Sequence, residues 1–417
     1  MRTKVSAALG TLILSLTLVA CGSSSGASSG GGSSSGTGTS SGAGHTYTIG
    51  VLADVTGPGA SVNGSAEEGV QAGVKLAARD GYTIKTIVAD TGTSPSQALT
   101  AAQQLVEQDN VVAVIAESAV TFGAAPWLTA HGVPVLGWSE DGSEWLTSQN
   151  MLSAAGPSDP AKVATTLGKF FKMVGVTNLA VVGYAYPLST EGAKSFADSA
   201  KQAGIKVGYL NDTVPLGTTN VQPLVLAMKS AGVNGFIGLL EPNAALLTIQ
   251  GLRQAGVDLK AGVLFTGYGG DLQQAGSGAE AAANGVYFPL QFEPVEMHTA
   301  ATEQLQSDLG SVGVKTDPTF AEYVGYLSVD LLVHGLEKTG ADPTQADLIK
   351  DMNGIANYDA AGLLANHTLN IGARTPVPSG VDNCLWFTKL SGKNFQLVQG
   401  ADPVCGSLVP GIDNSAS

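Results

Sequence analysis

The sequence predicts an α/β protein built from two doubly wound lobes with a ligand cleft between them. Its 417 residues exceed one ordinary domain, so two lobes are expected. From Tyr47 onward, short apolar runs bounded by Gly, Asp or Pro alternate with helical patterns. Such runs are typical of parallel strands buried on both faces. The β-α units form two batches, separated by the loop-forming segment Ala155-Gly156-Pro157-Ser158.

Repeated β-α units favour open, mostly parallel sheets with helices on both faces. The expected strands, in chain order, are Thr48–Ala53, Ile84–Ala89, Val111–Ile115, Val133–Leu136, Leu179–Val182, Lys206–Leu210, Gly235–Leu240, Val263–Phe265 and Gly285–Phe288.

Helix starts are indicated by a capping residue followed by Pro. Ser94-Pro95 combines this pair with Gln97, three residues after the cap. The same pair recurs at Asp159-Pro160, Asp317-Pro318 and Asp342-Pro343, and Gly204 and Gly256 are expected to close helices. Apolar helix faces are expected at Leu246, Leu247, Ile249 and Leu252, and at Phe320, Tyr323, Val324, Leu327 and Leu331.

The N-terminus predicts export and a lipid anchor. Arg2 and Lys4 precede an apolar run of about 16 residues, which suits a secretory signal better than a membrane span. Leu18-Val19-Ala20-Cys21-Gly22 resembles the lipobox of bacterial lipoproteins. We therefore expect a signal peptide over residues 1–20, lipid on Cys21, and a Gly/Ser-rich tether over 21–45. The alternative is an ordinary cleaved signal or an N-terminal helix with a chance Cys.

Composition excludes several functions. A net charge of −14 gives no electrostatic footprint for nucleic acid. Three Cys and five His are too few for a multi-Cys zinc module, and we expect neither a metal nor another cofactor. The chain has no H-E-x-x-H and no P-loop motif, and its His residues are dispersed. No catalytic residue is therefore expected.

Several segments together resemble one family. The resemblance lies in their order and spacing, and covers residues 46 to about 360. The segments are Thr48-Ile49-Gly50-Val51-Leu52-Ala53-Asp54-Val55-Thr56-Gly57-Pro58, Ala89-Asp90-Thr91-Gly92-Thr93-Ser94-Pro95, Ala101-Ala102-Gln103-Gln104-Leu105-Val106, Val111–Ala116, Gly132-Val133-Pro134-Val135-Leu136 and Thr190-Glu191-Gly192-Ala193-Lys194-Ser195-Phe196. The chain thus resembles type I periplasmic solute-binding proteins, the branched-chain amino-acid (Leu/Ile/Val) group in particular.

The resemblance implies the type I periplasmic binding protein fold, in which two Rossmann-like, doubly wound lobes enclose a ligand cleft. It also implies capture of a small metabolite, such as an amino acid, for an ABC importer. The partners would be a small-molecule solute, the permease and ATPase subunits, and the membrane through the lipid anchor. We expect residues 46–156 plus 289–357 to form the N-terminal lobe, and 158–287 plus 358–412 the C-terminal lobe. A ligand-sensing lipoprotein without a permease and an exported hydrolase on the same fold class are the alternatives.

Ligands of open α/β sheets bind beyond the carboxyl ends of the strands. On the first lobe this rule selects Ser118, Ala119 and Thr121, where N–H groups and hydroxyls could hold a carboxylate, as the resembling family does. An N-cap without ligand contact is the alternative there. The next strand leads to Trp138, Ser139 and Asp141, and a packed core residue is the alternative for Trp138.

On the second lobe the same rule selects Tyr184, Tyr186, Glu241 and Tyr268. Glu241 follows a buried strand and precedes Pro242, so it could bind a ligand ammonium or complement the helix dipole.

Cys384 and Cys405 are the thiols that remain once Cys21 is acylated. Disulfides persist in exported proteins, so we expect a bridge between these two, with two buried free thiols as the alternative.

Overall fold

The computed structural model describes residues 45–139, 142–156, 158–274, 277–374 and 380–415. The chain divides into two compact units, Met1–Thr39 and Ser40–Ser417. The predicted signal peptide, Cys21 and nearly all of the tether lie outside the described residues.

The first lobe is centred on a parallel sheet with strand order β2-β1-β3-β4-β5. Its strands are β1 (Thr46–Ala53), β2 (Thr83–Asp90), β3 (Ala113–Glu117), β4 (Val135–Gly137) and β5 (Met151–Ser153). The apolar runs predicted the first four. They missed β5, because its three residues are too few to give a pattern.

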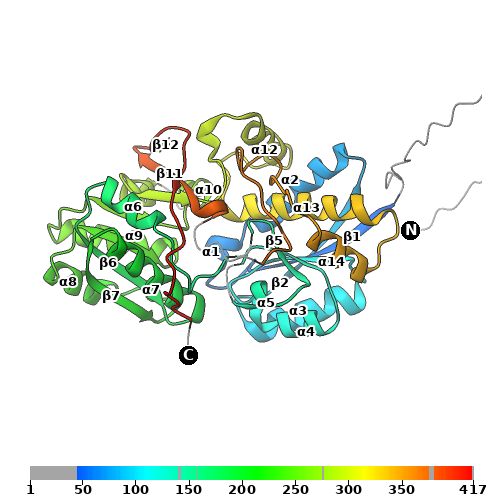
Figure 1. Ribbon diagram of the computed structural model, residues 1–417, viewed down its shortest axis with the longest axis horizontal. Coiled ribbons are helices and arrows are strands. Elements are labelled where there is room, and N and C mark those ends of the chain that lie inside the picture. Colours follow the sequence, from blue (N-terminus) through cyan, green and yellow to red (C-terminus); the bar gives the residue numbers. More distant parts are fainter. Residues whose placement is uncertain (1–44, 140–141, 157, 275–276, 375–379, 416–417) are drawn as a thin grey trace, which may run out of the picture. The chain divides into compact units, whose positions relative to one another are not determined.

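Helices of the first lobe come from two parts of the chain. They are α1 (Ala60–Asn63), α2 (Ala66–Arg79), α3 (Pro95–Gln103), η1 (Gln104–Gln108), η2 (Thr121–Gly123), α4 (Ala125–Ala130), α5 (Glu144–Thr147), η3 (Val295–Met297), α12 (Ala300–Ser311), α13 (Phe320–Thr339) and α14 (Gln345–Asn353). Helix α13 lies along α2 and also contacts β3 and β4 (Figure 1). The Arg79 guanidinium donates to both carboxylate oxygens of Asp308, at 2.7 and 2.6 Å, which ties α2 to α12.

The second lobe is centred on a mixed sheet with strand order β12-β11-β10-β9-β8-β6-β7, and β13 pairs with β11. Strands β6 to β10 are parallel, and β11 to β13 join antiparallel. The strands are β6 (Asn178–Tyr184), β7 (Lys206–Val214), β8 (Gly235–Leu239), β9 (Ala261–Leu264), β10 (Tyr287–Leu290), β11 (Cys384–Ser391), β12 (Asn394–Leu397) and β13 (Val404–Cys405). The helices are α6 (Thr166–Met173), α7 (Pro187–Gln202), α8 (Gln222–Ser230), α9 (Pro242–Gln254), α10 (Gly270–Gln274), α11 (Ser277–Ala283) and η4 (Val381–Asn383).

The cap-and-Pro predictions have three outcomes. Ser94 is the N-cap of α3 and Pro95 its first residue, as predicted. The start signals at Asp317-Pro318 and Asp342-Pro343 lie slightly early, because Thr319 and Thr344 are the capping residues of α13 and α14. The prediction at Asp159-Pro160 is wrong.

Residues 160–162 form a turn, and residues 163–165 pair with the C-terminal tail instead of with a following helical turn. Val409 N donates to Val163 O at 2.7 Å, and Thr165 N donates to Ser407 O at 3.0 Å. Asp159 Oδ1 also accepts from Ala161 N at 3.0 Å, which closes a local turn. Helix α6 therefore begins only at Thr166.

The other helix predictions hold with one exception. Gly204 and Gly256 follow α7 and α9 with φ of +78° and +79°, the left-handed conformation expected of them. On α9, Leu247 is 44% exposed, so it does not belong to the buried face that we predicted. The predicted face of α13 is buried throughout.

Residues 358–374, which the sequence analysis placed in the C-terminal lobe, contact elements of the first lobe. Tyr358 donates to Leu327 O of α13 at 2.9 Å. The Arg374 guanidinium donates to Trp145 O at 2.7 Å and to Gln149 O at 3.1 Å. After this segment, the described chain re-enters the second sheet at Cys384, the first residue of β11.

Glu322 predicts a pH dependence of stability. Burial raises its pKa from 4.5 to about 7, although Thr319 N donates to the carboxylate at 2.7 Å. As pH rises, the Glu322 carboxyl group loses its proton at a lower pH in the unfolded chain than in the folded protein. The free energy of unfolding should therefore fall between pH 4.5 and about 7, by on the order of 2 kcal/mol. Denaturant unfolding across this pH window should show a smaller fall in the free energy of unfolding for Glu322→Gln. The amide oxygen of Gln can still accept the capping hydrogen bond from Thr319 N. The matched control, Glu303→Gln at an exposed position on α12, should leave the fall unchanged. An equal pH dependence of stability in wild type and Glu322→Gln would contradict the role of Glu322.

Candidate functional site

A cavity of about 440 Å³ lies at the carboxyl ends of strands from both sheets. The loops after β1, β2, β3 and β4 supply one side, and those after β6, β8, β9 and β10 supply the other. Its first-lobe lining includes Val62, Thr93, Ala119, Phe122, Trp138 and Ser139, and its second-lobe lining includes Lys162, Tyr184, Tyr186, Leu188, Leu240, Glu241, Phe265 and Gln291. This is the position at which open α/β sheets bind ligands.

Beneath the first-lobe side lies a buried carboxylate, Asp54, which directly follows β1 and has no exposed surface. Its Oδ1 accepts from Ser118 Oγ at 2.6 Å and from Thr91 Oγ1. Its Oδ2 accepts from Ala119 N at 2.9 Å and from Asn63 Nδ2 at 3.0 Å. Four donors therefore satisfy this carboxylate without any cation, and they join the loops that follow β1, β2 and β3.

Residues 118–121 were expected to form a carboxylate cradle, a loop whose N–H groups and hydroxyls hold a ligand carboxylate, but their hydrogen bonds are made within the protein. Ser118 and Thr121 are buried and do not line the cavity. The N–H groups of this loop have internal acceptors: Ala119 N donates to Asp54, Val120 N to Ser118 Oγ, and Thr121 N to Ser118 O. The Thr121 hydroxyl donates to Ser118 O at 2.9 Å. The cradle has the predicted form, but the protein's own carboxylate fills it.

The loop after β4 contributes Trp138 and Ser139 to the lining. This was predicted by the rule that ligands bind beyond the carboxyl ends of the strands, called the strand-end rule below. The Trp138 ring packs on Phe320, with centroids 3.8 Å apart, so this side chain is both packing and cavity wall. Ser139 Oγ donates to Ser158 O at 3.0 Å. Asp141, the third predicted residue of this loop, lies outside the described residues.

Glu241 and Tyr184 meet at the second-lobe side of the cavity. Tyr184 ends β6 and its hydroxyl donates to Glu241 Oε2 at 2.9 Å. Glu241 occupies the N-cap position of α9, where its charge can complement the helix dipole, although its side chain makes no capping hydrogen bond. Burial raises the pKa of Glu241, and the Tyr184 hydrogen bond opposes that rise. Burial and the neighbouring carboxylate likewise raise the pKa of Tyr184, which keeps its phenol protonated.

The other two predicted tyrosines lie in different places. Tyr186 lines the cavity beside Tyr184, with ring centroids 6.4 Å apart. Tyr268 does not line it: the ring is buried against Phe395, and its hydroxyl donates to Glu296 Oε2 at 2.7 Å. The strand-end rule selected Tyr268 correctly as a loop residue but could not predict that its ring points into the core.

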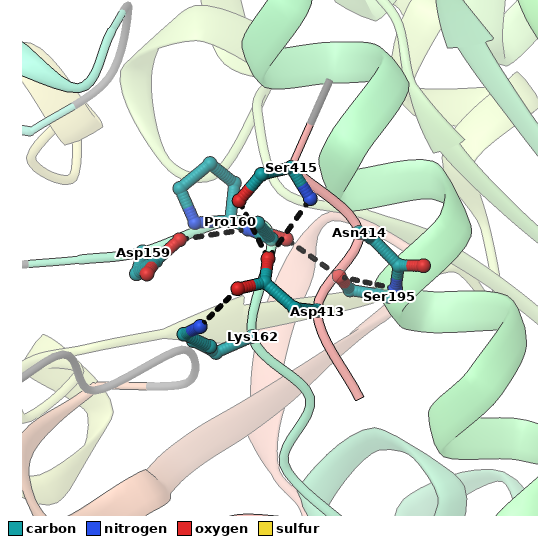
Figure 2. Close-up of polar contacts among 8 residues, drawn as sticks. Asp159, Pro160, Lys162, Ser195, Asp413, Asn414 and Ser415 are labelled. Atoms are coloured by element: carbon teal, nitrogen blue, oxygen red, sulfur yellow. Dashed lines mark hydrogen bonds and ion pairs between the residues drawn. The ribbon is translucent and has the colours of Figure 1, made fainter. Parts of the chain in front are cut away.

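Lys162 is a second charged lining residue, and the C-terminal tail neutralises it. Lys162 Nζ lies 2.5 Å from Asp413 Oδ2 (Figure 2). This ion pair lowers the pKa of Asp413 and raises that of Lys162. Asn414 Nδ2 donates to Ser195 Oγ on α7 at 3.2 Å, and Ser195 Oγ donates to Pro160 O at 2.6 Å, so the tail is attached to both segments. Sequence reasoning missed this pair because 251 residues separate its members.

Apolar side chains make up most of the remaining lining, and aromatic rings are prominent among them. Phe196 and Phe265 stack with centroids 5.1 Å apart. Within the described ranges, no group of three or more His, Cys, Asp or Glu side chains could hold a metal ion. No helix in the described part of the chain combines the length and apolarity needed to cross a bilayer. Two sheets whose strand-end loops enclose one apolar cavity define a binding protein of the two-lobed α/β class.

The chain belongs to the periplasmic binding protein family, whose model matches residues 46–394. The fold is the type I periplasmic binding protein fold that the sequence predicted. A comparison with curated protein sequences finds no match.

Solved structures share the fold at low sequence identity. A solute-binding protein of an ABC transporter from R. palustris, in complex with 4-hydroxybenzoate, has 16% identity and a TM-score of 0.70, covering 87% of this chain and 98% of that one. The substrate-binding protein LivJ from Streptococcus pneumoniae, in complex with isoleucine, has 17% identity and a TM-score of 0.68, covering 87% and 99%. The leucine-binding protein LivK from Thermotoga maritima has 15% identity and a TM-score of 0.68, covering 86% and 99%.

Proposed function

We propose that this protein is an extracytoplasmic, lipid-anchored solute-binding protein that captures a small metabolite for an ABC importer. The observation that carries the proposal is the cavity of about 440 Å³ lined by strand-end loops of both sheets. That volume and its apolar lining suit a small organic molecule. Family membership and the transporter proteins of the same fold support the importer role. The family also implies an extracytoplasmic location.

A thermal-shift screen of the globular body against small metabolites tests the binding role. Ala185 is exposed and lines the cavity, so Ala185→Trp should fill the cavity without disturbing the core. We expect this variant to lose the stabilisation by the best hit while its unliganded Tm stays within about a degree of wild type. Ala346→Trp, on the exposed side of α14, is the matched control and should keep the full shift. A ligand that stabilises Ala185→Trp as strongly as wild type would place binding elsewhere.

Mass spectrometry of the recovered hit separates binding from catalysis. An unchanged ligand after prolonged incubation agrees with a binding protein, whereas a stoichiometric excess of a cleaved product would favour the exported hydrolase.

Lipidation at Cys21 has its own test. Cys21→Ala removes the thiol that would take the diacylglycerol, so the protein should appear in the soluble fraction or stay as uncleaved precursor. Membrane fractionation and intact mass measure both results. Ser15→Ala, within the apolar run, is a control that should leave the fractionation and the mass of the processed protein unchanged. Membrane association and mass identical to wild type in Cys21→Ala would contradict the anchor.

A further inference from the structure

We infer that the ligand of this cavity is an organic ammonium ion with an apolar body and no carboxylate group. The inference rests on the proposed binding function and narrows it to one ligand class. Three features of the described residues carry it: the filled first-lobe cradle, the neutralised lysine, and the Glu241 carboxylate.

The first feature removes the place where a ligand carboxylate would be held. Every N–H group from Ala119 to Thr121 has an internal acceptor, and the Ser118 hydroxyl donates to Asp54. A ligand carboxylate at this loop would find no free donor among these groups. It would also approach the buried Asp54 carboxylate, and like charges at short range repel strongly in a medium of low dielectric constant.

The second feature concerns Lys162, the one basic side chain among the described lining residues. Its ammonium group is already paired with Asp413 at 2.5 Å. Binding an acid at Lys162 would require the ligand to displace the Asp413 carboxylate and the tail contacts of Asn414. The described lining therefore offers an anion no uncommitted positive charge.

The third feature is the charge that remains. Glu241 is half-buried, and its one described partner is the neutral hydroxyl of Tyr184, 2.9 Å from Oε2. A half-buried carboxylate without a cation is costly, and a ligand ammonium would supply the missing charge. The rings of Trp138, Tyr184 and Tyr186 line the same cavity, and aromatic faces also attract cations. The apolar remainder of the lining would contact the body of the ligand.

The test uses ligands that share one body and differ in their charged groups. Leucine carries both an ammonium and a carboxylate group, isoamylamine lacks the carboxylate, isocaproate lacks the ammonium, and isoamyl alcohol is neutral. Phenylalanine, phenethylamine, hydrocinnamate and 2-phenylethanol form a second series with an aromatic body. The amines are cationic at pH 7, since alkylamines resemble the Lys side chain. Calorimetric titration of the full globular body measures each Kd.

We expect at least one amine to bind tenfold or more tightly than its amino acid, acid and alcohol counterparts. Glu241→Gln should weaken that amine tenfold or more and leave the alcohol within threefold. Glu280→Gln, a second-lobe carboxylate outside the lining, is the matched control and should keep wild-type affinity.

Three results would overturn the inference. Tighter binding of the acid or the amino acid would show that a ligand carboxylate finds donors after all, and the solute-binding function itself would stand. An amine that binds Glu241→Gln within threefold of wild type would remove the role of Glu241. Failure of all these compounds at millimolar concentration would reject the ligand class. The binding function fails separately, if no metabolite in the wider screen stabilises the protein.

Discussion

Replacing Asp54 with Ala is expected to lower the free energy of unfolding by about 3–5 kcal/mol. The carboxylate is fully buried and accepts hydrogen bonds from Ser118, Thr91, Ala119 N and Asn63. Each buried donor left without an acceptor costs about 1–3 kcal/mol, and water entering the hole recovers part of the total. Urea unfolding of both proteins measures the difference.

A matched control lies beside Asp54 in the same sheet. Asp90 pairs in register with Ala53, the residue before Asp54. It accepts from Thr56 N at 3.0 Å, Thr56 Oγ1 at 2.6 Å and Gly92 N at 2.9 Å, but Asp90 is only half-buried, so water can replace these bonds. Asp90→Ala should therefore cost only about 1 kcal/mol. Equal losses of stability in the two variants would show that the burial of Asp54 does not increase the cost of removing its carboxylate.

Chemical rescue tests the cradle directly. The Asp54→Ala variant keeps all four donors around a hole of carboxylate size, so formate should raise its Tm in a concentration-dependent manner. Wild type, whose cradle is filled, should show no such shift beyond the general effect of salt. Chloride at the same ionic strength is the control for that general effect. Absence of rescue would mean that the loops rearrange once the carboxylate is lost.

The sequence predicts the fold well wherever it consists of repeated β-α units. Buried parallel strands are continuous apolar runs, and nine of them were found this way. The sequence analysis did not predict strands β11 to β13, because an antiparallel pair at a sheet edge needs a partner strand that hydrophobic periodicity cannot identify. The failure at Asp159-Pro160 has the same cause: the tail that pairs with residues 161–165 is more than 240 positions away.

The candidate site could be predicted only as far as loops, not as side-chain partners. The strand-end rule selected Ala119, Trp138, Ser139, Tyr184, Tyr186 and Glu241, and all six line the same cavity. It could not show that Ser118 serves a carboxylate from another loop, because that bond joins residues 64 positions apart. Asp54 itself follows a predicted strand, so the same rule applied there would have selected it.

Loss of the Cys384–Cys405 disulfide is expected to lower the free energy of unfolding by about 3 kcal/mol. The bond joins β11 to β13 and closes a loop with a sequence separation of 21. On the chain-entropy model, a loop of this size restricts the unfolded state by about that amount. The double variant Cys384→Ser, Cys405→Ser should show the loss in urea unfolding, and reduction of wild type should reproduce it. The double variant should change the Kd of the ligand little, because neither cysteine lines the cavity. Reductant added to the double variant is the control and should change nothing. If the two cysteines are free thiols, labelling of denatured, unreduced protein will find both, and reduction will leave the stability of wild type unchanged.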